Sequence, residues 1–475
     1  MSQIWGVLPV GIPVVGACCT LLVGSWAAVR RIAWGICVAF WLVGVFALAH
    51  VFPWDPLARW YNLLVLALGG LSLAVSIGYL DAERAHGDVD LPAARGYFAL
   101  FAAFLAALLA IGCVRNYLLI WAAVEGTTLT SIFLVAFHRL PGPVEAAWKY
   151  LVVTGVGGLC ALAGTVLVLH GAGLPLGAWR LLPGGLVPPG GRVAVEAGLV
   201  LAIAGFGSKA GLVPFHTWLP DAHSEAPAPV SAALSSVKLV GGLYALLRLD
   251  ALAAHAIGPA WPRVLLLATG MLSLAIAAAA VPGQRDLKRM FAYSSIEHMG
   301  VIALGVAFGG VGVLGALLHM WTHGFSKSAL FYGSGNVRLR YGATAAPRVR
   351  GVLAAMPLSG TALALGAVAI VGLPPFGLFW SEWLVLLGGI RAGQLVWVAV
   401  ALAFLVINFL GFGLRLPELL LGAAPAGRVQ SETAVALWPL AVALTGALVV
   451  GLALPAALHG TWTSAARLLG GGGLP

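Results

Sequence analysis

The segment GFGSKAGLVP, residues 205–214, places three glycines and a proline around Lys209 inside a long apolar run. Glycine and proline both disfavour a continuous helix, because one is too free and the other lacks a backbone N–H. Interrupted helices in membrane transporters leave backbone groups that meet water or charge, and ion sites lie beside the interruption. The segment therefore predicts a broken membrane helix with a charged group at the break.

Lysines and arginines are placed differently along the chain. Three of the five lysines, Lys209, Lys238 and Lys327, lie inside apolar runs, whereas the 21 arginines lie at the ends of such runs and in connections. A desolvated lysine can lose its proton, and an arginine effectively cannot. Lysines inside apolar runs therefore indicate groups that are titrated within the membrane.

The composition is that of a polytopic membrane protein. Of 475 residues, 61% are hydrophobic and 9% are charged, whereas about 25% charged residues are usual in soluble domains. The net charge of +10 forms no basic stripe with interleaved aromatic residues, which argues against nucleic-acid binding. The N-terminal apolar run has no basic flank or cleavage site, so it is predicted to be a retained span.

A membrane-spanning helix needs about 20 mostly apolar residues. The runs that meet this length are residues 4–28, 32–53, 61–80, 96–114, 117–137, 150–170, 194–219, 228–249, 263–281, 291–308, 312–337, the interrupted run 351–392, 394–414 and 433–455. They predict an all-α membrane protein with about fourteen transmembrane helices in a single integral domain over residues 1–475.

The second interruption is GLPPFG, residues 372–377. The two breaks fall in the seventh and twelfth predicted helices, and an offset of five crossings inverts the topology. This spacing predicts two inverted five-helix repeats, helices 4–8 (residues 96–249) and helices 9–13 (residues 250–415). Helices 1–3 (residues 1–95) precede the repeats, and helix 14 with a tail (residues 416–475) follows them.

Basic residues are more frequent in the odd-numbered connections than in the even-numbered ones. Arg30, Arg31, Lys288 and Arg289 are among those predicted to lie in odd-numbered connections. Lys and Arg are enriched in cytoplasmic loops. The odd-numbered connections are therefore predicted to face the cytoplasm, with both termini outside.

Glu125 lies near the middle of the fifth predicted span. A lone carboxylate at that depth would take up a proton, whereas a lysine within about 4 to 6 Å would keep it ionised. Lys209 is the natural partner. The alternative is a static buried pair that only fixes the helix register.

His319, His323 and Lys327 fall at positions i, i+4 and i+8 of the eleventh predicted span. They therefore lie one above another along about 12 Å of helix. Imidazole titrates near neutrality and can accept a proton on one nitrogen while donating from the other, as a proton wire requires. The sequence predicts a ladder of titratable groups along the membrane normal.

Further candidates lie near this ladder. Glu382 follows the second break and would end the series of buried charges, or else cap the next helix at the membrane surface. Glu297 and His298 are expected at a shallower depth. His216 and His223 follow the first break and predict either an aqueous entrance or a solvated loop.

No cofactor or metal is expected in this chain. The five cysteines have no spacing that suits zinc or an iron–sulfur cluster, and no nucleotide-binding or hydrolase motif is present. A lysine on the face that carries the histidines argues against a metal site there. No catalytic residue is predicted, and whether the chain belongs to an enzyme complex depends on its partners.

Four motifs carry a resemblance to a known family. They are FHTWLPDAHSEAPAPVSAA (residues 215–233), QRDLKRMFAYSSIEHMG (284–300), HMWTHGFSKSALFYGSGN (319–336) and GLPPFGLFWSEW (372–383). These motifs resemble the antiporter-like subunits shared by respiratory complex I, membrane-bound hydrogenases and multisubunit cation/proton antiporters. AAWKY (residues 146–150) and SSIEHMG make the chain most similar to hydrogenase-4 component F of group 4 nickel-iron hydrogenases.

The resemblance implies fourteen helices with inverted repeats and assigns a proton pathway. The family's functional groups match Glu125, Lys209, His323, Lys327 and Glu382. In complex I relatives a further lysine occupies the position that Val240 holds in this sequence. Lys238 lies two residues earlier, which is about 200° around a regular helix. Either the eighth helix is locally shifted, or Lys238 faces elsewhere and water or histidine forms the link.

The resemblance implies a proton-translocating subunit in a prokaryotic cytoplasmic membrane. Its expected partners are other membrane subunits, a peripheral redox arm, the lipid bilayer and protons. The favoured complex is a group 4 hydrogenase of the hydrogenase-4 or formate hydrogenlyase type. The alternatives are a complex I subunit, a sodium/proton antiporter or inorganic-carbon-uptake subunit on the same scaffold, and a non-conducting membrane anchor.

Overall fold

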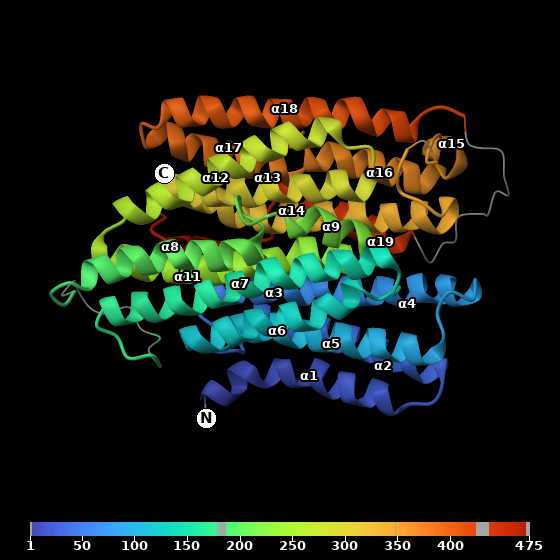
Figure 1. Cartoon of the computed structure of the whole chain (residues 1–475), viewed down its shortest axis with the longest axis horizontal. Helices are drawn as coiled ribbons and strands as arrows, with labels where there is room; N and C mark the ends of the chain where they lie inside the picture. The colour runs from blue at the N-terminus through green and yellow to red at the C-terminus, as the bar shows by residue number, and fades with distance from the viewer. Residues whose placement is uncertain (1, 178, 180–186, 347, 424–436, 472–475) are drawn as a thin grey trace.

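The computed structural model describes residues 2–177, 179, 187–346, 348–423 and 437–471. Within these ranges all regular secondary structure is helical, apart from one isolated bridge between Asp286 and Ala345. Most of the helices run roughly parallel or antiparallel to one another, with α1 (Ser2–Leu22) at one edge and α18 (Leu395–Leu420) at the opposite edge (Figure 1). The all-α prediction is confirmed for the described residues.

Ten helices in the described part of the chain are long and apolar enough to cross a membrane, and a bent pair raises this to eleven. They are α2 (Trp26–Leu48), α3 to α4 (Pro56–Ala85), α5 (Leu91–Cys113), α6 (Tyr117–Val135), α7 (Pro141–Gly171), α8 (Gly191–Ala210), α10 to α11 (Ala228–Ile257), α12 with its terminal turn (Ala260–Gly283), α13 (Leu287–Phe308), α18, and the bent pair α19 (Trp438–Leu452) with α20 (Ala456–Leu468). The molecule is therefore built as a multi-pass membrane protein.

The most buried elements carry the polar side chains. α14 (Val311–Tyr341) is buried along nearly its whole length and packs against α13, α17 (Gly377–Arg391) and α19. Helices such as α2, α7 and α18 expose large apolar side chains instead. This arrangement places charged groups inside the bundle and large apolar groups on its outside, as is expected of a membrane protein.

The first two predicted spans are displaced from the observed helices. Residues 4–28 and 32–53 were expected to be helical, but α1 ends at Leu22 and α2 begins at Trp26. Ser25 causes the early start, because its hydroxyl accepts a hydrogen bond from the backbone N–H of Ala28 and caps α2. The prediction missed this cap inside an apolar run.

The first predicted break is shorter than expected. Gly205 and Gly207 lie within α8, and the helix ends only at Ala210, with Gly211 in the left-handed region at φ 74°. The chain resumes as α9 (Trp218–Glu225). Lys209 therefore occupies the last helical turn before the break, and only the second half of the predicted segment interrupts the helix.

The glycines that precede the break let two helices approach closely. A Cβ atom on Gly205 would lie 2.2 Å from the backbone nitrogen of Ala161 on α7. Gly157, Gly164 and Gly171 on α7 face α8 in the same way. Small residues at a helix interface permit such backbone contact in membranes. The glycines thus bring α8 against α7 and set the position of Lys209.

The second predicted break is present. α16 (Pro357–Ile370) ends before it and α17 begins at Gly377, while the short helix α15 (Val352–Ala355) was not predicted. Gly372 has φ 71°, and a Cβ atom there would lie 2.3 Å from a carboxylate oxygen of Glu382. The break therefore lies directly against the Glu382 side chain.

The helix that carries Lys238 contains an irregular turn. Residues Leu234–Lys238 form a π-helical turn between α10 (Ala228–Ala233) and α11 (Leu239–Ile257), and a similar turn spans Val65–Gly69. A π-turn takes up an extra residue and rotates the side chains around it, and such turns are frequent at functional sites. The helix is therefore locally irregular at Lys238, as the first of the two alternatives for this residue requires.

Candidate functional site: a series of buried charged groups

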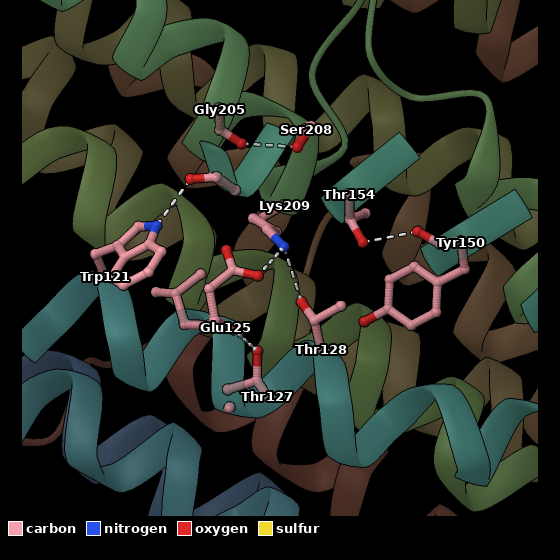
Figure 2. A network of polar contacts seen from close by, with 12 residues as sticks. Trp121, Glu125, Thr127, Thr128, Tyr150, Thr154, Gly205, Ser208 and Lys209 are labelled. Atoms are coloured by element: carbon pink, nitrogen blue, oxygen red, sulfur yellow. Dashed lines mark hydrogen bonds and ion pairs between the residues drawn. The ribbon is translucent and has the colours of Figure 1, made fainter. Parts of the chain in front are cut away.

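Lys209 and Glu125 form a buried ion pair. The Lys209 Nζ atom lies 2.8 Å from Glu125 Oε2 and 3.1 Å from Thr128 Oγ1, as Figure 2 shows. The Lys209 side chain is 0% exposed and that of Glu125 is 21% exposed. The partner predicted for Glu125 from the sequence is therefore the one that the structure places beside it.

The surroundings of Glu125 fix its position between α6 and α7. Trp121, one turn before it, donates a hydrogen bond from Nε1 to the carbonyl oxygen of Gly158 at 2.8 Å (Figure 2). A Cβ atom on Gly158 would lie 2.5 Å from Glu125 Oε1. The carboxylate therefore fits only because residue 158 has no side chain.

Lys238 lies next to this pair without a carboxylate of its own. Its Nζ donates a hydrogen bond to the carbonyl oxygen of Lys209 at 3.2 Å. The same atom lies 4.0 Å from the ring centroid of Trp218 and 4.8 Å from that of Tyr150. Aromatic faces attract a cation electrostatically, and among the described residues these contacts stand in place of an ion pair. Lys238 is therefore directed toward Lys209.

His223 is a core residue, so the solvated-loop alternative is wrong for it. Its side chain is fully buried, its Nδ1 bonds the carbonyl oxygen of Leu219 at 2.9 Å, and its Nε2 has no hydrogen-bond partner within the described ranges. Both Lys238 and Lys327 are close enough to interact with it electrostatically. His216, by contrast, is partly exposed at the break, so the two histidines differ in their access to solvent.

Lys327 is held by neutral groups. Its Nζ donates hydrogen bonds to the carbonyl oxygen of Phe291 and to the hydroxyl of Ser294, both on α13. Its side chain is fully buried, and no carboxylate lies within ion-pair distance in the part of the chain that the structure describes. Glu297, further along α13, is the acidic group that interacts with it electrostatically.

Three histidines meet between α13 and α14. His298 Nδ1 lies 3.0 Å from His319 Nε2, and His319 Nδ1 lies 2.9 Å from the Ser381 hydroxyl on α17. The ring centroids of His298 and His323 are 5.0 Å apart. The shallow position expected for His298 is wrong, because α13 begins at Leu287 and His298 is 1% exposed. The predicted ladder on α14 thus gains a fourth titratable group from α13.

Glu382 and Glu297 lie at the far end of this series. Together with Asn408 they line a cavity of about 20 Å³, which is room for one water molecule. Glu297 is buried and Glu382 is partly exposed. The series of titratable groups therefore ends at a carboxylate that reaches the surface of the chain.

Sequence reasoning missed Lys288. It was assigned to a connection, but it lies in the first turn of α13, is fully buried and donates hydrogen bonds to the carbonyl oxygens of Ser224 and Ala226. The signal was present, because Asp286 accepts a hydrogen bond from the N–H of Arg289 at 2.8 Å and caps the helix. An N-cap at residue 286 places Lys288 inside the helix.

Comparison with known proteins gives a consistent result. Residues 115–409 match the family described as NADH:quinone oxidoreductase/Mrp antiporter, TM. The hydrogenase-4 component F homolog of Methylacidiphilum infernorum is 36% identical over 369 residues, covering 75% of this chain and 76% of that protein. The NADH-quinone oxidoreductase subunit N of Desulforudis audaxviator is 35% identical over 369 residues, covering 73% and 69%.

A solved structure shares the fold over nearly the whole chain. A chain of the membrane-bound sulfane sulfur reductase, described as an archaeal respiratory membrane complex, superposes with a TM-score of 0.85 and 24% identity, covering 98% of both chains. The family match spans more than half of this sequence and includes Glu125, Lys209 and Lys327. The chain therefore belongs to the NADH:quinone oxidoreductase/Mrp antiporter membrane-subunit family, whose relatives are antiporter-like subunits of complex I, hydrogenases and Mrp antiporters.

Proposed function

We propose that this chain translocates protons as a subunit of a redox-driven membrane complex. The observation that carries the proposal is the series of buried titratable groups that runs from the Glu125–Lys209 pair to Glu382. Its intermediate members are Lys238, His223, Lys327, His323, His319 and His298. Charged groups inside a membrane protein are costly and mark ion pathways.

The pair of Glu125 and Lys209 is the element that a redox partner would bias. When the two side chains separate, Lys209 loses its carboxylate and its proton becomes easier to release. Moving one charge against 100 mV takes about 2.3 kcal/mol, and one pKa unit corresponds to about 1.36 kcal/mol. Opening or closing one buried ion pair therefore supplies enough free energy for one proton.

The path beyond the pair follows the contacts of the side chains. Lys238 donates a hydrogen bond to the backbone carbonyl of Lys209, and His223 lies near enough to Lys238, Lys327 and Lys288 for electrostatic interaction with each of them. No hydrogen bond joins Lys238, His223 and Lys327 to one another within the described ranges, so bridging water would complete the path. Beyond Lys327 the histidines of α13 and α14 lead to Glu382.

The finer assignments belong to the same proposal. The breaks after α8 and α16 support fourteen membrane crossings with two inverted five-helix repeats, because each break lies beside a charged group of the series. The excess of basic residues in odd-numbered connections supports an orientation with both termini outside. The similarity to proteins of Methylacidiphilum infernorum and Desulforudis audaxviator supports a prokaryotic cytoplasmic membrane. The similarity to a hydrogenase-4 component F homolog supports a group 4 nickel-iron hydrogenase with a peripheral redox arm.

The partner subunits of the intact complex would identify the redox reaction that drives translocation. Gentle detergent extraction through a tag on this chain, followed by mass spectrometry of the intact assembly, should recover a nickel-iron subunit. Recovery of a quinone-reducing arm instead would overturn the hydrogenase assignment. Sodium-dependent activity of the extracted complex would favour the sodium/proton antiporter, and ion-flux measurements would then decide between proton and sodium translocation.

Lys209→Met tests translocation directly. We expect redox-driven acidification or alkalinisation of vesicles containing the complex to fall to the background leak, because methionine has no proton to transfer. Lys149→Met is the matched control, since Lys149 lies at the surface and pairs with Glu145 and Asp221. Unchanged pumping in an assembled Lys209→Met complex would show that the chain acts as a membrane anchor.

A further inference from the structure

The histidine cluster and Glu382 offer three ligand atoms in a small volume. One donor atom from each of His298, His319 and Glu382 lies within 4.8 Å of the others. The two imidazole nitrogens that face each other, His298 Nδ1 and His319 Nε2, are 3.0 Å apart. Two nitrogens bound to one tetrahedral zinc ion at about 2.05 Å would be about 3.3 Å apart. The pair is therefore close to the separation that a shared metal ion demands.

Hydrogen bonds around the cluster favour the tautomer of His319 that carries its proton on Nδ1. The Ser381 hydroxyl donates to the carbonyl oxygen of Leu378 at 2.8 Å, so it accepts the bond from His319 Nδ1. His319 Nε2 is then a free lone pair that points at His298. A hydrogen bond from the second nitrogen of a ligating histidine fixes its tautomer and ring orientation in metal sites, and Ser381 accepts such a bond here.

His298 can supply the second nitrogen by moving its own proton. In the metal-free chain its Nδ1–H donates to His319 Nε2. Its other nitrogen, Nε2, is buried and has no hydrogen-bond partner among the residues that the structure describes. When the proton resides on Nε2 instead, the Nδ1 lone pair becomes available, and no charge is created.

The charges around the cluster suit a divalent cation. Glu382 contributes a carboxylate ligand, and Glu297 lies beside it in the same small cavity. Lys327 is the opposing charge. It lies about 12 Å along α14 from His319, but its Nζ bonds Ser294, one helical turn before His298 on α13, and it interacts electrostatically with His298. The two carboxylates outnumber this single cation. His323, the remaining titratable neighbour, has its ring centroid 5.0 Å from that of His298.

We propose that His298, His319 and Glu382 bind a zinc-class divalent ion and that this ion blocks the end of the pathway that Glu382 occupies. Two imidazoles, one carboxylate and a water molecule form a tetrahedral set that Zn²⁺ prefers. The partly exposed Glu382 gives the ion its route to the two buried histidines. Binding stands on the geometry alone, whereas the block rests on the proposed proton pathway.

X-ray absorption at the zinc edge tests binding in the unmodified complex. With one equivalent of Zn²⁺ we expect about two imidazole nitrogens and about two oxygens near 2.0 Å, in a tetrahedral arrangement. This measurement uses the unmodified complex, so misfolding of a variant cannot account for the result. A spectrum with oxygen ligands only, or with six-coordinate zinc, would show an adventitious surface ion and overturn the site.

Two variants assign the ligands. His298→Gln and Glu382→Gln should each weaken Zn²⁺ binding at least about tenfold, because each removes one of three protein ligands. His86→Gln is the control, since His86 is exposed and bonds only its own helix through Ala82. Affinity that stays at the wild-type value in an assembled His298→Gln complex would overturn the assignment.

Flux measurements separate the two parts of the proposal. In vesicles we expect Zn²⁺ to inhibit redox-driven proton translocation at the concentration at which it binds, and to inhibit His86→Gln equally. Zinc bound to the histidines without inhibition would overturn the block and place the pathway elsewhere. Zinc bound to a Lys209→Met complex that still pumps would overturn the proposed function while the metal site stands.

Discussion

Two lysines of the series, Lys209 and Lys327, are held in opposite ways. Lys209 contacts a carboxylate at 2.8 Å, whereas Lys327 contacts a carbonyl oxygen and a hydroxyl and, among the described residues, no carboxylate. Both side chains are fully buried. One region therefore stabilises a charged lysine by an ion pair, and the other offers only neutral hydrogen-bond acceptors.

This difference indicates separate roles in proton transfer for the Lys209 and Lys327 regions. A buried ion pair is strongly destabilised when one partner leaves, because an uncompensated charge remains. A lysine among neutral acceptors has no ion pair to break, so it can exchange its proton more readily. We infer that the Glu125–Lys209 pair acts as the gate and that Lys327 acts as a relay.

The largest effect is expected from Glu125→Gln. It should lower the free energy of unfolding by about 3 kcal/mol, the lower end of the range for breaking a buried pair, since Glu125 is 21% exposed. Glu297→Gln should change stability much less, because Glu297 makes no ion pair within the described ranges. Thermal unfolding in detergent would measure both.

A double variant sharpens the same comparison. Glu125→Gln combined with Lys209→Met removes both charges, so stability should recover relative to Glu125→Gln while proton translocation stays absent. Equal losses of stability in Glu125→Gln and Glu297→Gln would contradict the distinction between the two regions.

Gly158→Ala should disturb the gate by crowding it. The new Cβ would lie 2.5 Å from the Glu125 carboxylate, and overpacking of this kind typically costs about 1–3 kcal/mol. Gly155→Ala, on the same helix, is the control because a Cβ there meets nothing within 4 Å, and alanine favours a helix over glycine. A Gly158→Ala complex with unchanged stability and flux would show that Glu125 is free to move aside.

Trp218→Leu tests the link between the two regions. The substitution removes the nearer aromatic face from Lys238, whose Nζ lies 4.0 Å from the ring centroid. A desolvated cation–π contact is worth about 2 kcal/mol, so we expect slower translocation with the Glu125–Lys209 pair intact. Trp148→Leu, at an exposed site on α7, should pump at the wild-type rate; equal slowing in both variants would assign the effect to general packing.

The sequence predicted the contacts that follow from composition and helical period. The breaks, the Glu125–Lys209 pair and the ladder of His319, His323 and Lys327 all depend on residue type and spacing. The position of Lys238 depends on a π-helical turn, which has no distinctive residue pattern.

Side-chain contacts between separate helices could not be predicted from residue type and spacing along the sequence either. His298 meets His319 across the α13–α14 interface, and His138 meets the buried Glu83 at 2.9 Å. Such pairs depend on how helices dock, and the glycines that allow α7 and α8 to approach act through tertiary packing. The burial of Glu83 and Lys288 was therefore not predicted from the sequence.

The smallest effect is expected from Ser294→Ala, which tests whether neutral acceptors matter at the relay. The variant removes one acceptor from Lys327 and leaves the carbonyl oxygen of Phe291. One hydrogen bond to a charged group contributes about 1.5–3 kcal/mol when lost from a buried site, but the remaining acceptor and water offset part of it, so we expect less destabilisation than in Glu125→Gln. Translocation should continue with a shifted pH profile, because Lys327 holds its proton less firmly. A complete loss of pumping would mean that Lys327 depends on its hydroxyl partner as strongly as Lys209 depends on Glu125, and the division into gate and relay would fail.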